Sequence, residues 1–362
     1  MIEMKRFGEF ASFKYGKMPN KNKITDIGKY PVYSGYRYVG YYDEYNTEAN
    51  QVIIVARGVG GTGDVKLTKE KCYLTNLSIA ANIDEKIALP EFIYYYYLPR
   101  NLRYLDSGSA QSQITISDLE KVMIPLPSLD EQKAICGYME MLDGKIENNE
   151  KINKNLEQQA QAIFKSWFID LEPFSNRKPS DWSVSTLGNV SIMGAGGDKP
   201  QNVSPIKTDF YKYPIYSNGL SNEGLYGFTD KPKIYEESVT VSARGTIGFV
   251  CLRHIPYVPI VRLVTLTPKT EIISAKYLYL WLKQLHITGT GTTQQQLTVP
   301  DFQKTEILLP SQEIVTLFTA TVDPIFEKIR ANQNENEKLS SLRDTLLPKL
   351  MSGELDVSDI DL

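Results

Sequence analysis

Histidine and cysteine are scarce in this chain of 362 residues, which contains two histidines and three cysteines. The cysteines Cys72, Cys136 and Cys251 lie far apart and are odd in number. Neither they nor His254 and His286 have the close spacing of zinc ligands. The sequence therefore favours a cytoplasmic protein without a bound metal.

Long hydrophobic runs are missing as well. No apolar run approaches the roughly 18 residues of a membrane span, and the first residues, MIEMKRFGEF, lack the apolar region of a signal peptide. We therefore expect no membrane-spanning segment. The net charge of −3 gives no overall sign of a nucleic-acid partner, and a hydrophobic fraction of 42% suits a globular protein of two or three domains.

Motifs for three kinds of catalysis are also missing. Base methylation would need an Asn/Asp-Pro-Pro-aromatic motif, and ATP-driven translocation would need a G-x-x-x-x-G-K-[ST] loop. Hydrolysis by a Ser-His-Asp triad would be supported by a G-x-S-x-G turn. The sequence carries no motif for base methylation, ATP-driven translocation or triad hydrolysis of these kinds.

A candidate nucleotide-binding turn is present in VIIVARGVGGTGDV at 52–65. Gly58, Gly60 and Gly63 have the G-x-G-x-x-G spacing of a dinucleotide site. The segment VTVSARGTIGFV at 239–250 repeats Ala-Arg-Gly without that spacing, and the residues after Gly63 alternate like a strand rather than the helix that a phosphate site needs. The pattern predicts a tight turn between two strands, with a nucleotide-binding enzyme as a rival hypothesis.

The chain consists of two copies of one unit. The segment KYPVYSG at 29–35 returns as KYPIYSN at 212–218, and DSGSAQSQITISDL at 106–119 returns as GTGTTQQQLTVPDF at 289–302. Both pairs are separated by the same offset of 183 residues. Two copies are too few for a solenoid. We therefore predict a tandem of two related domains, each closed by its own long helix.

The predicted fold class is α+β. Within each copy, alternating apolar and polar residues with frequent Gly, Pro and Asn indicate strands and turns, and one helix is expected at 90–102 and at 274–285. Two long helices join the mixed domains as an antiparallel coiled coil with internal pseudo-twofold symmetry. The predicted segments are a first domain at 1–129, a central helix at 130–170, a second domain at 171–311, a C-terminal helix at 312–352 and an acidic tail at 353–362.

The two long helices carry heptad repeats with apolar a and d positions, which we call the seam. Two asparagines fall on the same seam positions in both helices. Asn in an apolar seam fixes the partner and the register, because each amide needs a matching amide; the simpler interpretation is that Asn is common on long polar helices. The predicted seam residues are Leu142, Ile146, Asn149, Asn153, Leu156, Ile163, Ile329, Asn332, Asn336, Leu339 and Leu346.

Antiparallel pairing of the two long helices brings their seam residues into matching pairs. Pairs whose residue numbers add up to 485 bring apolar residues together, and they place Asn149 beside Asn336 and Asn153 beside Asn332. Pro324, near the start of the second helix, is expected to kink or restart it. Two related domains on a helical spacer suit a target with two marks at a fixed distance, such as duplex DNA.

Several short motifs together resemble a known family. They are the start of each copy (Phe7-Gly8-Glu9-Phe10 and Leu187-Gly188-Asn189-Val190), the KYPxYS segment, the Ala-Arg-Gly turn, the Gln-Ile/Leu-Thr segment, PLPSLDEQKAI and LLPKLMSGELDV. In this order, and in duplicate, they resemble the specificity (S) subunit of type I restriction–modification systems over essentially the whole chain. The resemblance implies two target-recognition domains, each reading one half of a split asymmetric DNA sequence, with the coiled coil setting the gap.

The resemblance also implies the partners. Double-stranded DNA is the target, two modification (methyltransferase) subunits dock on the coiled coil and the domain flanks, and restriction subunits complete the complex. The resemblance implies that this chain is a non-catalytic subunit and that the methyltransferase and nuclease activities belong to its partners. S-adenosylmethionine, ATP and Mg²⁺ are expected on those subunits, so no cofactor is expected on this chain, and no membrane partner is implied. The alternative is a non-enzymatic adaptor whose coiled coil joins two protein partners.

Candidate DNA contacts are assigned to the turns, because phosphate contacts need Lys, Arg or backbone N–H groups and base readout needs polar side chains. Five lysines are expected to face the DNA backbone: Lys14, Lys17, Lys21, Lys199 and Lys207. The candidate base readers differ between the copies, Tyr36 and Arg37 against Leu220, Ser221 and Asn222. The candidate positioning groups are Ser34, Ser217 and Asn218.

Arg57 and Arg244 occupy the same place in the two copies, before a glycine turn. Because the copies should read different sequences, a shared arginine cannot carry specificity. Each is therefore either a phosphate contact or an internal brace. Gln113 and Gln296 are assigned a hinge role, and the tyrosine run at 94–97 is assigned to helix packing.

Overall fold

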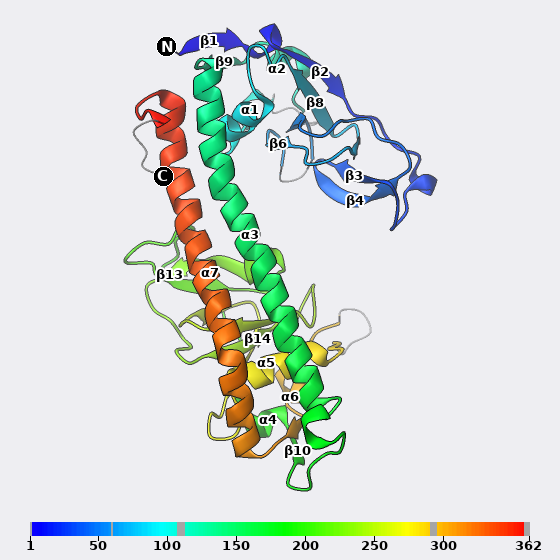
Figure 1. Ribbon diagram of the computed structural model, residues 1–362, viewed down its shortest axis with the longest axis vertical. Coiled ribbons are helices and arrows are strands. Elements are labelled where there is room, and N and C mark those ends of the chain that lie inside the picture. The colour runs from blue at the N-terminus through cyan, green and yellow to red at the C-terminus, as the bar shows by residue number, and fades with distance from the viewer. Residues whose placement is uncertain (1, 59–60, 107–112, 290–294, 358–362) are drawn as a thin grey trace. The chain divides into compact units, whose positions relative to one another are not determined.

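The computed structural model describes residues 2–58, 61–106, 113–289 and 295–357 (Figure 1). The chain divides into two compact units, and each long helix contributes one part to each of them. Unit 1 comprises Met1–Asn149 with Gln333–Leu362, and unit 2 comprises Glu150–Asn332. Three sequence features lie partly outside the described residues: Gly60 of the glycine turn, the repeated segments at 106–119 and 289–302, and the end of the acidic tail.

Unit 1 contains three small sheets. β1 (Glu3–Arg6) pairs with β9 (Met123–Leu126), an antiparallel four-stranded sheet has the order β2-β8-β5-β6, and a three-stranded sheet has the order β4-β3-β7. β5 reads VIIV and is buried throughout, as an inner strand requires. The other strands are β2 (Ala11–Tyr15), β3 (Tyr30–Ser34), β4 (Arg37–Tyr42), β5 (Val52–Val55), β6 (Val65–Leu67), β7 (Tyr73–Leu74) and β8 (Ser78–Ile83).

Unit 2 repeats this topology strand for strand. β10 (Ser183–Thr186) pairs with β18 (Glu306–Leu309), and the larger sheets have the orders β11-β17-β14-β15 and β13-β12-β16. In both units the shortest sheet strand, β7 or β16, pairs parallel to the strand of the KYPxYS motif. The other strands are β11 (Ser191–Ala195), β12 (Tyr213–Tyr216), β13 (Leu225–Thr229), β14 (Ser238–Val241), β15 (Val250–Arg253), β16 (Val258–Pro259) and β17 (Val264–Pro268).

Some of the helices begin at side-chain caps that the sequence supplies. Ser128 and Glu131 form a reciprocal capping box at the start of α3, with Glu131 N to Ser128 Oγ at 3.3 Å and Ser128 N to Glu131 Oε2 at 2.8 Å. The α-helices are α1 (Pro90–Tyr97), α2 (Ile116–Leu119), α3 (Leu129–Phe168), α4 (Leu187–Val190), α5 (Ala275–Gln284), α6 (Val299–Phe302) and α7 (Gln312–Ser352). The 3₁₀ turns are η1 (Phe7–Glu9), η2 (Lys21–Lys23), η3 (Arg103–Leu105), η4 (Glu172–Phe174) and η5 (Ser221–Gly224).

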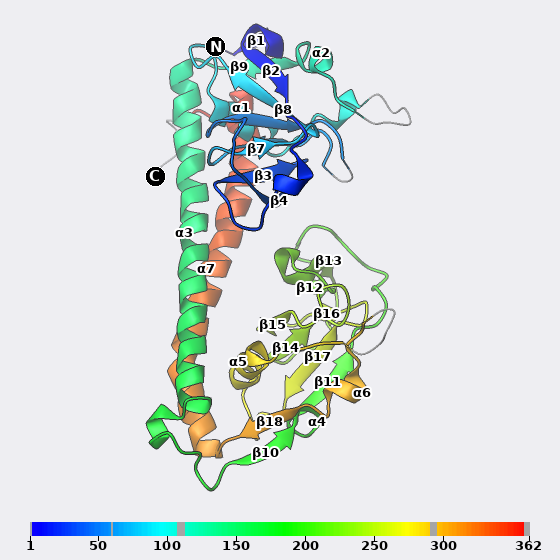
Figure 2. The same ribbon diagram turned by 90° about the vertical axis from the view of Figure 1, so that its right-hand side faces the viewer.

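Each unit closes its core with one short helix and a stretch of both long helices. The helices expected at 90–102 and 274–285 are confirmed as α1 and α5. In unit 2, α5 lies between the four-stranded sheet and the long helices (Figure 2), and an aromatic cluster that includes Phe164, Phe168, Tyr277 and Phe318 fills this interface. In unit 1, α1 fills the same place, and its tyrosine run packs against the core as predicted.

The long helices pair antiparallel in each unit, in the predicted register. In unit 1, Asn149 Nδ2 donates to Asn336 Oδ1 at 2.9 Å and to Glu335 Oε2 at 2.8 Å. In unit 2, Asn332 Nδ2 donates to Asn153 Oδ1 at 2.8 Å. Asn149 and Asn332 are each only 2% exposed. The asparagines are therefore paired seam residues and not surface residues of long polar helices.

The expected restart of the helix at Pro324 is wrong. α7 is one continuous helix from Gln312 to Ser352. Val322, two residues before the proline, is fully buried and stays on the seam face. The proline lies on the exposed side of the helix, where its ring meets solvent rather than α3. The heptad assignment therefore continues through this residue.

Candidate functional site

Three duplicated motifs of unit 1 meet at one end of its sheets. Ile114 N donates to Ala56 O at 2.9 Å, which joins the Gln-Ile-Thr segment to the Ala-Arg-Gly turn. Gly35, in the turn after the KYPxYS strand, is the third partner, because a Cβ atom built on it would lie 3.7 Å from Arg57 O. We call Ser34–Arg37, Ala56–Gly58 and Gln113–Ile114 the turn cluster of unit 1.

The same motifs meet in unit 2, with a different side chain at the centre. Leu297 N donates to Ala243 O at 3.0 Å, as Ile114 does in unit 1. Asn218 accepts from Ala243 N at 2.7 Å and donates to Val261 O at 2.5 Å. We call Ser217–Asn218, Ala243–Gly245 and Gln296–Leu297 the turn cluster of unit 2. The sequence reasoning found all three motifs but not that they touch.

Tyr36 is directed into unit 1. Gly35 and Tyr36 have φ values of 54° and 58°, the left-handed pair that forms a two-residue hairpin turn between β3 and β4. The Tyr36 hydroxyl donates to Leu67 O at 2.8 Å, and its ring stacks on Tyr33 at 5.0 Å. Burial raises the pKa of Tyr36 to about 12. Of the two base readers predicted here, only Arg37 has an exposed side chain.

The glycine turn is a hairpin between strands. β5 pairs with β6 so that Ile54 faces Val65, and no helix follows Gly63. Gly63 has φ +90°, and a Cβ atom on it would lie 2.4 Å from Arg103 N. Glycine is therefore needed here for close packing against η3. The prediction of a turn between two strands is confirmed.

Both shared arginines have internal partners. Arg57 Nη2 donates to Asn76 O at 3.4 Å. Arg244 Nη2 donates to Gln296 Oε1 at 2.9 Å and so ties its turn to the Gln-Leu-Thr segment. Gln113 Nε2 donates to Tyr15 Oη at 3.3 Å. Each arginine therefore makes an intramolecular hydrogen bond, Arg57 to Asn76 outside the turn cluster and Arg244 to Gln296 inside it.

The predicted lysines are spread over several elements, and Lys14 lies in strand β2 rather than in a turn. Lys17 N donates to Leu74 O at 3.0 Å, and the next residue, Thr75, contacts Ser34, so the backbone at Lys17 lies near the turn cluster of unit 1. Lys14 lines a neighbouring hollow of about 470 Å³. Lys21 lies in η2, Lys199 Nζ lies 5.9 Å from the centre of the Tyr226 ring, and Lys207 is exposed in the loop before β12.

A buried arginine that the sequence did not reveal supports η5, the turn of unit 2 that carries the predicted base reader Asn222. Arg253 is 3% exposed, and its guanidinium lies 3.6 Å from the centre of the Tyr216 ring. It donates to the carboxylate of Glu223 at 3.1 Å and to the carbonyl of Glu223 at 2.7 Å. Asn222 is exposed on this turn at φ 47°. Nothing in the strand sequence VCLR distinguishes an arginine that points inward from one in solvent.

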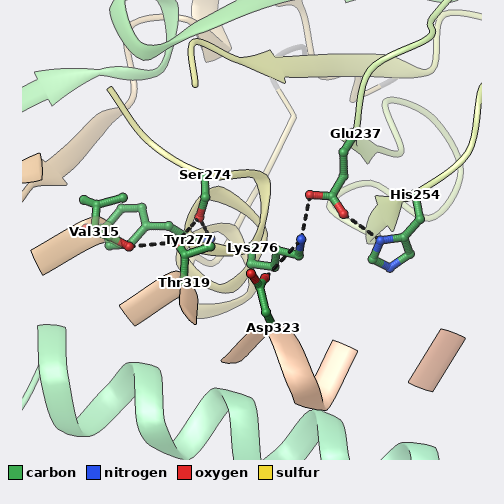
Figure 3. A network of polar contacts seen from close by, with 8 residues as sticks. All are labelled: Glu237, His254, Ser274, Lys276, Tyr277, Val315, Thr319 and Asp323. Atoms are coloured by element: carbon green, nitrogen blue, oxygen red, sulfur yellow. Dashed lines mark hydrogen bonds and ion pairs between the residues drawn. The ribbon is translucent and has the colours of Figure 1, made fainter. Parts of the chain in front are cut away.

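A polar network fastens unit 2 to its stretch of α7 (Figure 3). Lys276 Nζ, at the start of α5, lies 3.0 Å from Glu237 Oε2 and 3.2 Å from Asp323 Oδ1. His254 Nδ1 lies 2.7 Å from Glu237 Oε1. Burial alone would raise the pKa of Glu237, but the hydrogen bonds from His254 and Lys276 outweigh it and hold that pKa below its usual value.

The corresponding place in unit 1 carries two carboxylates. Glu91 is the second residue of α1, as Lys276 is of α5, and Glu140 of α3 corresponds to Asp323 at the offset of 183. Burial, and then the charge of Glu91, raise the pKa of Glu140. The two domains are therefore fastened differently to the long helices.

The described residues contain no cluster of three or more His, Cys, Asp or Glu side chains placed to hold a metal ion. Among the helices in the described ranges, none is both long and apolar enough to cross a membrane.

Comparisons with known proteins agree on one family. The chain matches the family model of the type I restriction modification DNA specificity domain over residues 2–158 and 179–341. The type I restriction enzyme MjaIX specificity subunit of Methanocaldococcus jannaschii is 29% identical over 319 residues, which cover 79% of this chain and 74% of that protein. A putative type I specificity subunit of Mycoplasma pneumoniae is 25% identical over 340 residues, 92% of this chain and 91% of that protein. The S subunit structure from M. genitalium has the same fold, with a TM-score of 0.61 at 22% identity over 97% of this chain and 96% of that one.

Proposed function

Since the chain belongs to the type I restriction–modification DNA specificity family, we propose that each of its two domains reads one half of a split, asymmetric DNA site. The observation that carries this proposal is the pair of turn clusters. The same three motifs build both clusters, whereas the side chains on the adjoining hairpin turns differ, Tyr36 and Arg37 against Leu220 and Asn222. A shared scaffold with different side chains suits two domains that bind one kind of ligand and read different sequences.

In this proposal the coiled coil sets the spacer between the half-sites and docks two modification subunits. The paired seam asparagines support a fixed register, because a slipped register would leave buried amides without partners. The modification subunits bring S-adenosylmethionine, and restriction subunits bring ATP-driven translocation and Mg²⁺-dependent cleavage. This chain takes no part in the chemistry.

We assign the DNA contacts to the turns. Arg37 and Asn222 are proposed as base readers, and Lys17 as a phosphate contact beside the turn cluster. Ser34, Asn218 and the backbone of Ser217 hold the turns, and Arg57 and Arg244 brace them from within. Outlying phosphate contacts are assigned to Lys14, Lys21, Lys199 and Lys207. Loss of a phosphate lysine is expected to weaken binding to all sequences, and loss of a reader to relax one base position.

The test is methylation mapping. The chain is co-expressed with its modification subunit, and host DNA is sequenced for N6-methyladenine. A split motif of two short blocks around a fixed gap is expected. If the complex assembles and no such motif is methylated, the specificity role is excluded, and a coiled-coil adaptor that joins two protein partners becomes the leading hypothesis.

A further inference from the structure

An isoleucine stands at the tip of a turn in unit 1 and is almost fully in solvent. Ile27 is 88% exposed. The turn is fixed by Thr25, whose hydroxyl donates to Ile27 O at 2.8 Å. Thr25 is fixed in turn by two backbone hydrogen bonds with Tyr41 of β4, at 3.1 and 2.8 Å. The isoleucine is therefore held outward by a defined structure.

Unit 2 builds the same turn. Ile206 is 70% exposed, and the Ser204 hydroxyl donates to Ile206 O at 2.6 Å. Ser204 exchanges backbone hydrogen bonds with Phe228 of β13 at 2.9 and 2.8 Å. Tyr41 and Phe228 are equivalent residues, because they face Pro31 and Pro214 of the repeated KYPxYS segments.

The sequence repeat does not reveal this equivalence. The loop from the isoleucine to the KYPxYS strand is longer in unit 2, so alignment at the offset of 183 places Ile27 opposite Phe210 instead. The structural match depends on the strand pairing and on the hydroxyl that closes each turn. It therefore supplies an observation independent of the sequence motifs.

The charged residues next to both tips in the sequence are mainly cationic. Lys21, Lys23 and Lys29 flank Ile27, with Asp26 as the acid between them, and Lys207 and Lys212 flank Ile206, with Asp209. Lys29 and Lys212 lie over the rings of Tyr30 and Tyr213, each at 5.2 Å. A single exposed apolar residue needs no explanation. Two in equivalent turns, each flanked by lysines, match a polyanion that also offers an apolar surface.

We propose that Ile27 and Ile206 are groove contacts to duplex DNA, one in each half-site, with the flanking lysines on the adjacent phosphates. Proteins use apolar side chains in DNA grooves in two ways, against thymine methyl groups and as wedges between base steps. Both place the isoleucine on the apolar surface of the bases. This inference rests on the proposed function, because it assigns the contact to the half-sites that the two domains read.

The test uses the complex of the full chain with its modification subunits and duplex DNA that carries the mapped site. The variants are Ile27→Ala and Ile206→Ala. The controls are Met123→Ala in unit 1 and Ile255→Ala in unit 2, which shorten other apolar side chains with 46% and 47% exposure. Each tip variant is expected to weaken specific binding by about tenfold while thermal unfolding and complex assembly stay unchanged. The controls are expected to bind like the wild type.

The outcomes separate this inference from the function on which it rests. A wild-type complex that selects no DNA sequence overturns both. A wild-type complex that selects its site, with tip variants that bind it equally well, overturns the inference alone. Loss of complex assembly in the tip variants also overturns it, and assigns the tips to the modification subunit.

Modified DNA distinguishes the two kinds of apolar surface. Deoxyuridine in place of thymidine removes the methyl groups, so it abolishes the difference between wild type and variant if the isoleucines contact thymine. A fluorescent adenine analogue beside the contacted step brightens on wild-type binding, and not on variant binding, if the isoleucines unstack the bases. A difference between wild type and variant that neither probe changes contradicts a groove contact.

Discussion

Single polar side chains hold the turns of this protein, and Asn218 is the clearest case. Its amide joins Ala243 and Val261, two segments that are distant in the chain. The sequence suggested a positioning group for DNA, and the structure gives the amide two partners within unit 2. Positioning here is achieved through the protein scaffold.

Asn218→Ala is expected to lower the free energy of unfolding of unit 2 by about 2 kcal/mol, because it leaves one N–H and one carbonyl without partners. Chemical denaturation of the full chain measures this. Ser217→Ala, which loses only a hydroxyl contact of 3.5 Å, is the matched control and is expected to be nearly neutral. Equal stability of the two variants would contradict the assignment.

Residue orientation is also where sequence reasoning reached its limit. Tyr36 has an internal hydrogen bond and Arg253 is buried against Tyr216, and no local pattern distinguishes these orientations from exposed ones. The tips Ile27 and Ile206 were missed because unequal loops hide their equivalence. By contrast, the seam asparagines were placed correctly, because heptad spacing ties each residue number to a direction.

At the scale of elements, the seam shows polar pairs that fix a register at a cost in stability. Asn149→Leu alone is expected to lower the free energy of unfolding by about 1–3 kcal/mol, because the half-buried amide of Asn336 loses the hydrogen bond from Asn149. The double change Asn149→Leu with Asn336→Leu is expected to restore or exceed wild-type stability, because both polar groups are then gone. Thermal unfolding measures the three proteins. A double variant as unstable as the single one would show that the pair acts by more than its mutual hydrogen bond.

The network between α5 and α7 is a second element-level device, and it predicts a pH dependence. Lys276→Met is expected to destabilise unit 2 by about 1–3 kcal/mol at neutral pH, since Glu237 and Asp323 lose their shared cation. The pKa of Glu237 is lower in the folded state than its ordinary value of 4.5. The stability that this carboxylate contributes is therefore present above pH 4.5 and is lost as the pH falls through the folded value.

The free energy of unfolding of the wild type and of Lys276→Met is measured with denaturant from pH 7 downward. The difference between the two proteins is expected to become smaller below pH 4.5. Lys304→Met is the control, because it removes an exposed ion pair to Asp301 of the same unit at 3.7 Å. Such a pair is expected to contribute less than about 1 kcal/mol. If the difference in free energy of unfolding did not change with pH, the effect of Lys276 would be assigned to packing.

At the scale of the whole molecule, the duplicated topology predicts that the domains are interchangeable. Exchange of residues 1–129 for the matching segment of another specificity subunit is expected to change one block of the methylated motif and to leave the other block and the gap intact. Sequencing of N6-methyladenine in host DNA reads out both blocks. Changes in both blocks would contradict independent reading.

The repeat itself, the fold class and the long helices were predictable at this scale. Length and periodicity encode them, and errors in single residues do not alter a pattern that occurs twice. At Pro324, the rule that proline interrupts a helix predicted a break. α7 is nevertheless continuous there, and the seam residues on both sides of the proline are buried. The arrangement of three motifs into one turn cluster was not predictable, because it depends on pairing between distant strands.

The division of the chain into units has a consequence for synthesis. Unit 2 is one uninterrupted stretch, whereas the core of unit 1 includes Leu347, Leu350 and Met351 from the far part of the chain. A chain emerging from the ribosome therefore completes its second domain first, although domains generally fold in order of synthesis. The core residues of the first domain that pack against α7 therefore stay exposed to solvent until α7 has been synthesised. Protease treatment of nascent chains stalled beyond residue 332 is expected to spare 150–332 and to cleave within 1–149.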